Sequence, residues 1–264
     1  MSNLFINFLR SLKPYTGKMA TKAKMSVKVD EMLPYIGEFG MYQIIQMIMI
    51  CLVHVAIILP AHHLSYFATL ESPWRCIRNS SICLMNDTFT PEDSMYSRRC
   101  LLPRDSWTYT QNKAFSVITY FDLSCDWQGE LVISAFYVGW SLGAAVSGWS
   151  SDRFGRRRIF FISTCCTLAV TLVSAFSPNV WFLIVGRLLV GFFFTGSCFQ
   201  GFLLMTEMVG ERHRMVVGSV YWLIGTLAYM LLPLLAYGVQ DWKKLFIIAS
   251  VPFSWVVIFF RFIP

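Results

Sequence analysis

The sequence predicts an all-α membrane protein with six transmembrane helices. Hydrophobic residues make up 56% of the 264-residue chain and charged residues only 14%, and the mean hydropathy is +0.54. Soluble domains carry roughly a quarter charged residues, so this composition indicates that lipid surrounds most of the chain. Because lysines and arginines gather in short segments beside apolar stretches, the net charge of +7 reports membrane topology rather than nucleic-acid binding.

Six apolar stretches are each close to the roughly 20 residues that cross a bilayer as a helix. They cover about residues 42–67, 131–149, 159–176, 180–205, 215–239 and 245–263. The first begins near residue 40 without a small-residue cleavage pattern, so no signal peptide is expected. We expect residues 1–40 to form a cytoplasmic segment and residues 41–264 to form one six-helix bundle.

Basic residues predict the orientation of these helices. They precede the first helix and occupy the connections between helices 2 and 3 and between helices 4 and 5, namely at Arg10, Lys13, Lys18, Lys22, Lys24, Lys28, Arg153, Arg156, Arg157, Arg158, Arg212 and Arg214. By the positive-inside rule these segments face the cytoplasm. Lys243 and Lys244, near the connection between helices 5 and 6, fit the rule less well. A multi-pass protein of the plasma membrane with both ends in the cytoplasm is expected.

The connection between the first two helices, about residues 68–129, is long and polar. It holds two N-glycosylation sequons, which begin at Asn79 and Asn86, and four cysteines, Cys76, Cys83, Cys100 and Cys125. Such a combination is typical of an oxidising, glycosylating compartment, so the loop is predicted to be extracellular and disulfide-bonded, with the pairing left open. The alternative is chance sequons with free thiols. Metal binding is disfavoured because no C-x-x-C spacing occurs.

A charged run between the second and third apolar stretches, Gly148–Arg157, reads G-W-S-S-D-R-F-G-R-R. A dense charged turn between two membrane helices is stable only where it reaches water. An ordinary cytoplasmic loop explains the arginines of this run, but not Asp152 or the glycines Gly148 and Gly155. The run closely resembles the G-x-x-x-D-R-x-G-R-R signature between helices 2 and 3 of the major facilitator superfamily.

Further segments resemble one group of that superfamily, the organic cation/anion/carnitine transporter family. That family has a large loop with cysteines and glycosylation sites between helices 1 and 2. Short motifs that resemble the family's occur at 36–40 (I-G-E-F-G), 121–127 (F-D-L-S-C-D-W), 186–191 (G-R-L-L-V-G) and 206–210 (T-E-M-V-G). Val190 stands where the third of these motifs usually has Gln. The resemblance covers about residues 34–264.

The resemblance implies that the chain is the amino-terminal half of a twelve-helix carrier. In such carriers the substrate lies between two six-helix halves near the bilayer midplane. Family members continue after helix 6 with a P-E-S-P-R motif, so a carboxyl-terminal half is an expected partner that this chain does not contain. A fragment and a natural short form both stay open.

The implied function is transport of small organic ions by alternating access, with organic cations favoured. A non-transporting half protein that associates with a full-length relative is one alternative, and an organic anion or carnitine carrier is another. No catalytic constellation, phosphate-binding loop or zinc spacing is visible in the sequence. An enzyme, a cofactor or a bound metal is therefore not expected.

The resemblance also implies a conformational latch at the cytoplasmic helix ends. In the family, the aspartate that matches Asp152 helps to hold the outward-facing state by meeting a helix end and nearby arginines. A latch that forms and breaks in every cycle suits modest pair energies. For Arg212 and Arg214 the alternative is ordinary surface charge in contact with water. The candidate latch residues are Gly148, Asp152, Arg153, Gly155, Arg156, Arg157, Glu207, Arg212 and Arg214.

Four residues match cavity-lining positions of organic cation transporters: Cys198, Phe202, Tyr221 and Trp222. Family members often have Trp at the position of Cys198, Tyr at that of Phe202 and Gln at that of Trp222. Aromatic faces bind ammonium groups by cation–π attraction, and no basic residue lies near the centre of this wall, so cations or zwitterions are favoured. Aromatic residues that merely face lipid or the core are the alternative.

Several other residues inside the apolar stretches are noteworthy. Arg187 is either a functional intramembrane charge or a side chain that extends to water. Gly139 and Gly143 form a G-x-x-x-G pattern that favours close helix packing. The histidines of helix 1 are expected to be polar packing or cavity-wetting groups rather than metal ligands, and they are His54, His62 and His63.

Overall fold

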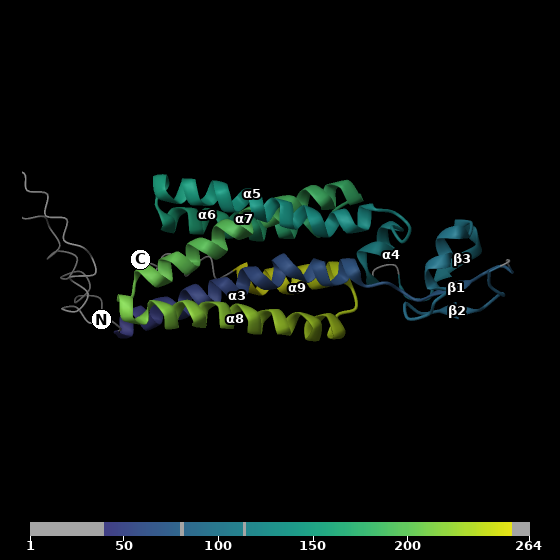
Figure 1. Cartoon of the computed structure of the whole chain (residues 1–264), viewed down its shortest axis with the longest axis horizontal. Helices are drawn as coiled ribbons and strands as arrows, with labels where there is room; N and C mark the ends of the chain where they lie inside the picture. The colour runs from purple at the N-terminus through teal and green to yellow at the C-terminus, as the bar shows by residue number, and fades with distance from the viewer. Residues whose placement is uncertain (1–39, 80–81, 113–114, 255–264) are drawn as a thin grey trace, which may run out of the picture.

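The computed structural model describes residues 40–79, 82–112 and 115–254, and Figure 1 shows their arrangement. Within this part of the chain, five helices are long and apolar enough to cross a membrane. They are α3 (Met41–Thr69), α5 (Gln128–Phe154), α6 (Arg156–Ser174), α7 (Val180–Glu207) and α8 (Glu211–Gly238). A further helix, α9 (Trp242–Ser254), begins where the sixth predicted span begins. The end of that predicted span, and the predicted segment 1–40 except Gly40, lie outside the described residues.

The helices form two groups that lie side by side along their length (Figure 1). In one group, α7 packs against both α5 and α6. In the other, α3 packs against α8 and α9. The two groups meet where α3 contacts α7. Buried apolar clusters at three levels of the bundle hold the groups together.

Small residues allow α5 and α7 to approach closely. A Cβ atom at Gly139 would lie 2.0 Å from the carbonyl oxygen of Leu188, and one at Gly191 would lie 2.0 Å from that of Phe136. Both distances are far below van der Waals contact, so only glycine fits. The close packing predicted from the G-x-x-x-G pattern is therefore confirmed.

The connection between α5 and α6 is shorter than predicted. Residues 148–154 continue α5 as helix, and Gly155 alone separates it from α6. The backbone of Gly155 has φ +90°, a value that favours glycine over residues with a side chain. The predicted turn over Gly148–Arg157 is therefore wrong for every residue except Gly155. Charged side chains can reach water from the last turn of one helix and the first turn of the next, so they do not require the helix to end.

Between α3 and α5 the chain forms a small cross-linked unit beyond one end of the bundle (Figure 1). The strands β1 (Trp74–Cys76), β2 (Thr88–Phe89) and β3 (Trp107–Tyr109) make an antiparallel sheet in the order β2-β1-β3. Short 3₁₀ helices, η1 (Tyr96–Leu101) and η2 (Arg104–Ser106), precede β3. The helix α4 (Val117–Phe121) returns the chain to α5.

Aromatic packing and two disulfides stabilise this unit. Its buried cluster is centred on Trp74, whose ring stacks on Phe89 at 4.6 Å and meets the edge of Trp107 at 5.9 Å. The disulfides join Cys76 to Cys83 and Cys100 to Cys125. The prediction that these cysteines form disulfides is confirmed, and the pairing that the sequence left open is now defined.

Candidate functional site

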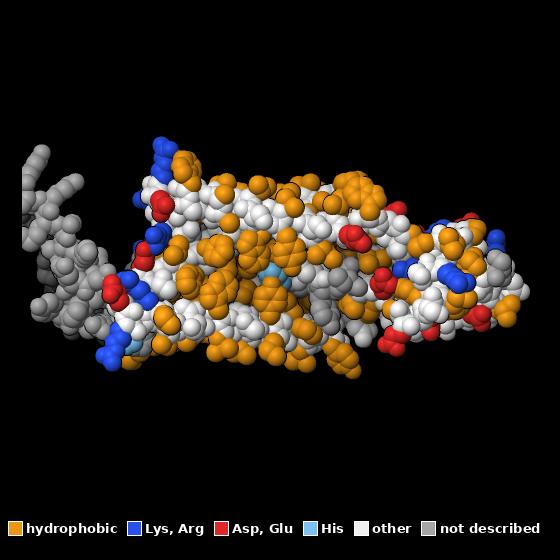
Figure 2. All heavy atoms as spheres, in the orientation of Figure 1, with side chains coloured by type: hydrophobic (Ala, Val, Ile, Leu, Met, Phe, Trp, Pro, Cys, Tyr) orange, Lys and Arg blue, Asp and Glu red, His pale blue; other side chains and the backbone are white. Residues whose placement is uncertain are grey.

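A small cavity of about 80 Å³ lies at the junction of α3, α5, α7 and α8. On the side of the molecule drawn in Figure 2, the pale blue of histidine is visible in a hollow near the middle of the helices, surrounded by hydrophobic side chains. Aromatic and histidine side chains dominate the wall, and none of the described residues that line it is Asp, Glu, Lys or Arg. The lining residues are His54, Ile58, His62, Trp140, Phe194, Cys198, Trp222, Gly225, Thr226 and Tyr229.

Two of the four predicted cavity residues line this space directly. Cys198 of α7 is buried, and Trp222 of α8 is 42% exposed. Tyr221 lies behind the wall, where its hydroxyl donates a hydrogen bond to the carbonyl oxygen of Cys198 at 2.8 Å. The ring of Tyr221 also stacks on His54, with ring centroids 4.0 Å apart. Its role is therefore to position its neighbours in this conformation, and substrate contact by these residues stays a prediction.

Phe202, the remaining predicted residue, lies in a neighbouring open pocket of about 470 Å³. This pocket also contains Thr206 and Gly218, and it shares Trp222 with the central cavity. The ring centroids of Phe202 and Trp222 are 6.0 Å apart. The structure thus brings all four predicted residues together around one edge of the bundle interior.

Sequence reasoning missed three aromatic residues of the wall. Trp140, Phe194 and Tyr229 come from three different helices and surround His62 with ring-centroid distances of 6.1, 5.0 and 4.5 Å. In helices that are apolar on every side, the sequence carries no signal for the side that faces a cavity. One clue was available at Trp140, because it follows Gly139 at the close contact of α5 with α7.

Arg187 is buried inside the bundle, with 1% of its surface exposed. Its guanidinium donates hydrogen bonds to the carbonyl oxygen of Ala61 at 2.6 Å and to Oγ of Ser65 at 2.9 Å. It also lies 4.6 Å above the ring of Phe136. Extension of this side chain to water, one of the two alternatives for it, does not occur in this structure.

The charged end of the bundle brings some of the predicted latch residues together. Arg156, at the start of α6, donates to the carboxylate of Glu207, which ends α7, and the two form an ion pair. Asp152 and Arg153 are exposed in the last turn of α5, with the Arg153 guanidinium 5.5 Å from the Trp149 ring. No described residue forms an ion pair with Asp152.

The other latch candidates lie around this pair, and their positions alone do not define a role. Arg157 and Arg212 are exposed, and Arg214 lines the open pocket beside Phe202. A Cβ atom added at Gly148 would meet no heavy atom within 4 Å, and Gly155 forms the connection already described. Their participation in a latch stays a prediction.

The predicted glycosylation residues are both exposed in the disulfide-bonded unit. The side-chain oxygen of Asn79 accepts a hydrogen bond from the backbone N–H of Met85 at 2.7 Å. Asn86 adopts a left-handed backbone conformation with φ +75°. Both acceptor asparagines are therefore accessible at the surface of this unit, and glycan attachment stays a prediction.

Two tyrosines of the same unit have perturbed acidities. Burial raises the pKa of Tyr96 to about 12, and its hydroxyl donates to the carbonyl oxygen of Ser72 at 2.8 Å. Burial likewise raises the pKa of Tyr109 to about 12. The Tyr109 hydroxyl donates to Asp122 at 3.0 Å and also contacts Ser124. Both phenols act as neutral structural donors at physiological pH.

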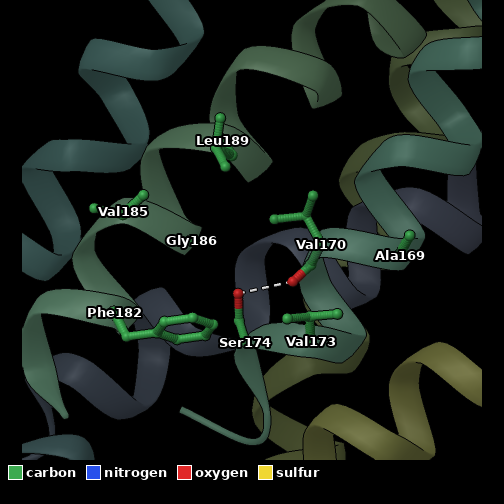
Figure 3. Close-up of a pocket in the computed structure, with 8 residues that line it drawn as sticks. All are labelled: Ala169, Val170, Val173, Ser174, Phe182, Val185, Gly186 and Leu189. Atoms are coloured by element: carbon green, nitrogen blue, oxygen red, sulfur yellow. Dashed lines mark hydrogen bonds between the residues drawn. The ribbon is translucent and has the colours of Figure 1, made fainter. Parts of the chain in front are cut away.

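A separate pocket of about 230 Å³ lies between α6 and α7 (Figure 3). Its wall is apolar, and its one hydroxyl, on Ser174, turns back to donate to the carbonyl oxygen of Val170 at 2.8 Å. It offers no free polar group to a ligand and does not belong to the central cavity. Within the described residues, no cluster of three His, Cys, Asp or Glu side chains could hold a metal ion.

Known proteins match the chain over most of its length. The family described as sugar (and other) transporter matches residues 81–264. Organic cation/carnitine transporter 4 of Arabidopsis thaliana is 32% identical over 85% of this chain and 41% of its own length. Solute carrier family 22 member 2 of Homo sapiens is 30% identical over 78% of this chain and 39% of its own length.

The chain spans about 40% of the length of these curated relatives, which are transporters and not enzymes. Its membrane-length helices agree with a multi-pass membrane protein. The resemblance stated from the sequence motifs is thereby confirmed. The chain belongs to the sugar (and other) transporter family of the major facilitator superfamily, with organic cation/carnitine transporters among its relatives.

Proposed function

We propose that the chain forms the amino-terminal six-helix half of a carrier that moves small organic cations across the plasma membrane by alternating access. The central cavity carries this proposal. Its wall combines Trp140, Phe194, Trp222 and Tyr229, and no Asp, Glu, Lys or Arg of the described part of the chain lines it. Each aromatic face can attract an ammonium group by about 0.5–2 kcal/mol, whereas an anion at this depth would need a positive partner.

The buried Arg187 does not supply that positive partner in the described conformation. Its guanidinium is held by Ala61 and Ser65 and covered by Phe136, and it is not part of the cavity wall. The names of the relatives, organic cation/carnitine transporter, support a cation or a zwitterion that carries an ammonium group. An organic anion is the less favoured substrate.

The proposal includes a topology and a partner. The charged helix ends near Asp152 and Arg156 would face the cytoplasm, and the disulfide-bonded unit with Asn79 and Asn86 would be extracellular. A carboxyl-terminal half of six helices would complete the cavity, which is supported by relatives more than twice as long as the matched segment. In that assembly, Asp152 would meet a helix end of the second half as part of the latch.

Uptake into cells tests the transport proposal. The chain would be expressed together with the carboxyl-terminal half of an organic cation/carnitine transporter, with each half alone as a control. We expect saturable uptake of a tetraethylammonium tracer only when both halves are present. Saturable uptake of a benzoate tracer without tetraethylammonium uptake would refute the cation assignment. Loss of a full-length relative's activity on co-expression, without uptake of either tracer, would favour the non-transporting half protein.

A further inference from the structure

Two histidines of α3 line the central cavity and hold ring nitrogens that lack hydrogen-bond partners among the described residues. His54 has none of its surface exposed and His62 has 4% exposed. Neither ring nitrogen of His54 is hydrogen-bonded to a described residue, and the same holds for Nε2 of His62. Buried polar atoms in folded proteins are nearly always paired, so two such residues in one cavity wall require an explanation.

The third histidine of this helix provides a comparison. His63 follows His62 directly, yet its Nδ1 lies 2.7 Å from the carbonyl oxygen of Pro60 and its ring meets Phe246 of α9 edge-on at 3.9 Å. It does not line the cavity. Nε2 of His63 also lacks a hydrogen-bond partner among the described residues, but this ring packs against α9 and does not reach the cavity. Only His54 and His62 combine an unpartnered ring nitrogen with a place in the cavity wall.

Aromatic rings lie close to both cavity histidines. His62 lies among Phe136, Phe194 and Tyr229, with ring centroids within 5.0 Å. His54 lies between Tyr221 and Gly225, and a Cβ atom at Gly225 would come within 2.7 Å of its Nε2. Only glycine fits at position 225, because the His54 ring packs directly against its backbone in the wall of the cavity.

We propose that His54 and His62 accept hydrogen bonds from the N–H groups of a protonated amine that occupies the cavity. A neutral imidazole has one acceptor nitrogen, and hydrogen bonds from charged donors are stronger than those between neutral groups. The aromatic faces attract any ammonium group, but a quaternary ammonium has no N–H to donate. The histidine pair therefore selects amines that retain N–H over their fully methylated analogues. This selectivity rests on the proposed function, since it assumes that cations enter the cavity.

Tracer binding to the full 264-residue chain in lipid nanodiscs tests the pair. The probes are phenethylammonium and its N,N,N-trimethyl analogue, which share the ring and the charge but differ in N–H groups. We expect the wild-type chain to bind the first about tenfold more tightly, the ratio typical of one charge-assisted hydrogen bond. In the double variant His54→Phe/His62→Phe this preference should disappear while binding of the trimethyl analogue is kept.

Two further variants separate hydrogen bonding from packing. His63→Phe removes a histidine of the same helix outside the cavity and should keep the tenfold preference. His54→Gln/His62→Gln retains an acceptor oxygen at each position and should restore part of the preference, which also covers the case in which the Phe pair does not fold. Equal affinity of the wild type for both probes, or a preference that survives in the Phe pair, overturns the inference. No saturable binding of either probe also overturns it, whereas the uptake experiment above decides the proposed function independently.

Discussion

At the scale of single residues, Arg187 is the most demanding side chain in the bundle. A guanidinium placed inside a membrane protein is costly unless every donor finds an acceptor. Its Nη1 and Nη2 donate to the carbonyl oxygen of Ala61 and the hydroxyl of Ser65, and the guanidinium lies over the ring of Phe136. Its Nε has no hydrogen-bond partner among the described residues. The residue thereby ties α7 to α3 and α5 at the level of the cavity.

Replacing Arg187 by lysine tests the structural role of its contacts. Arg187→Lys keeps the charge but replaces a planar fork by a point donor, which cannot reach both acceptors and stack on Phe136 at once. We expect a loss of about 1–2 kcal/mol in stability, measured as a lower thermal unfolding temperature of the chain in detergent. Arg158→Lys, at an exposed position, is the control and should leave the unfolding temperature unchanged. Equal unfolding temperatures for both variants would argue against the role.

Tyr96 predicts a pH dependence of the disulfide-bonded unit. Its pKa is raised by burial from 10 to about 12, so the folded unit holds the phenol proton more tightly than the unfolded chain does. The associated stability is complete below pH 10 and is lost as the pH rises towards about 12. Urea unfolding followed by tryptophan fluorescence at pH 8 and pH 11 should show this loss.

A matched substitution separates this effect from general alkaline damage. Tyr96→Phe should reduce the difference in stability between the two pH values without removing it, because Tyr109 shifts in the same direction. The control Tyr237→Phe changes an exposed tyrosine of α8 outside this unit. An unchanged difference in the Tyr96 variant would contradict the assignment.

At the scale of helices, the contact of α5 with α7 depends on the absence of side chains. In Gly139→Ala the new methyl group would meet the backbone oxygen of Leu188, which cannot move aside without displacing α7. Overpacking of this kind costs about 1–3 kcal/mol. Gly148→Ala, in the same helix, places its methyl group in open space and should keep or slightly raise stability. Thermal unfolding of both variants measures the contrast, and a comparable loss in both would show that the close contact is not formed.

The sequence predicted where the helices begin and end better than it predicted which side of each helix faces its neighbours. The fourth span, about residues 180–205, agrees with α7 within two residues, because Asn179 caps its start and the apolar run is long. The sequence left the burial of Arg187 open as one of two alternatives, and it did not predict the position of Tyr221 behind the cavity wall. Both depend on which side of an apolar helix faces its neighbours, and that is decided by packing rather than by periodicity.

At the scale of the whole molecule, the charged residues at the helix ends differ in whether they have an ion-pair partner within the described chain. Arg156 and Glu207 pair within the described residues, whereas Asp152 is exposed near the negative end of the α5 dipole. A negative charge in that position is better stabilised by the amino-terminal end of another helix. This is the arrangement that the proposed latch requires from a second half.

Asp152→Asn tests the latch with little change in volume. Loss of a contact worth about 1 kcal/mol would shift the balance between outward- and inward-facing states about fivefold. We expect slower tetraethylammonium turnover with unchanged surface expression when the variant chain is paired with a carboxyl-terminal half. Arg158→Gln, which changes an exposed charge nearby, is the control. Normal turnover in the Asp152 variant would indicate a merely solvated residue.

The orientation of the molecule can be read from the disulfide-bonded unit, because it carries the two sequons and lies at one end of the bundle (Figure 1). If that end is extracellular, Asn79 and Asn86 pass through the glycosylating compartment during synthesis. Glycosidase treatment should then increase the gel mobility of the wild-type chain from eukaryotic cells and leave an Asn79→Gln/Asn86→Gln variant unchanged. Since Asn79 also accepts a hydrogen bond from Met85, Ser81→Ala/Thr88→Ala is the sharper control, as it removes both sequons and keeps both asparagines. A wild-type chain that shows no shift and whose loop reacts with reagents only from the cytoplasmic side would reverse the proposed orientation.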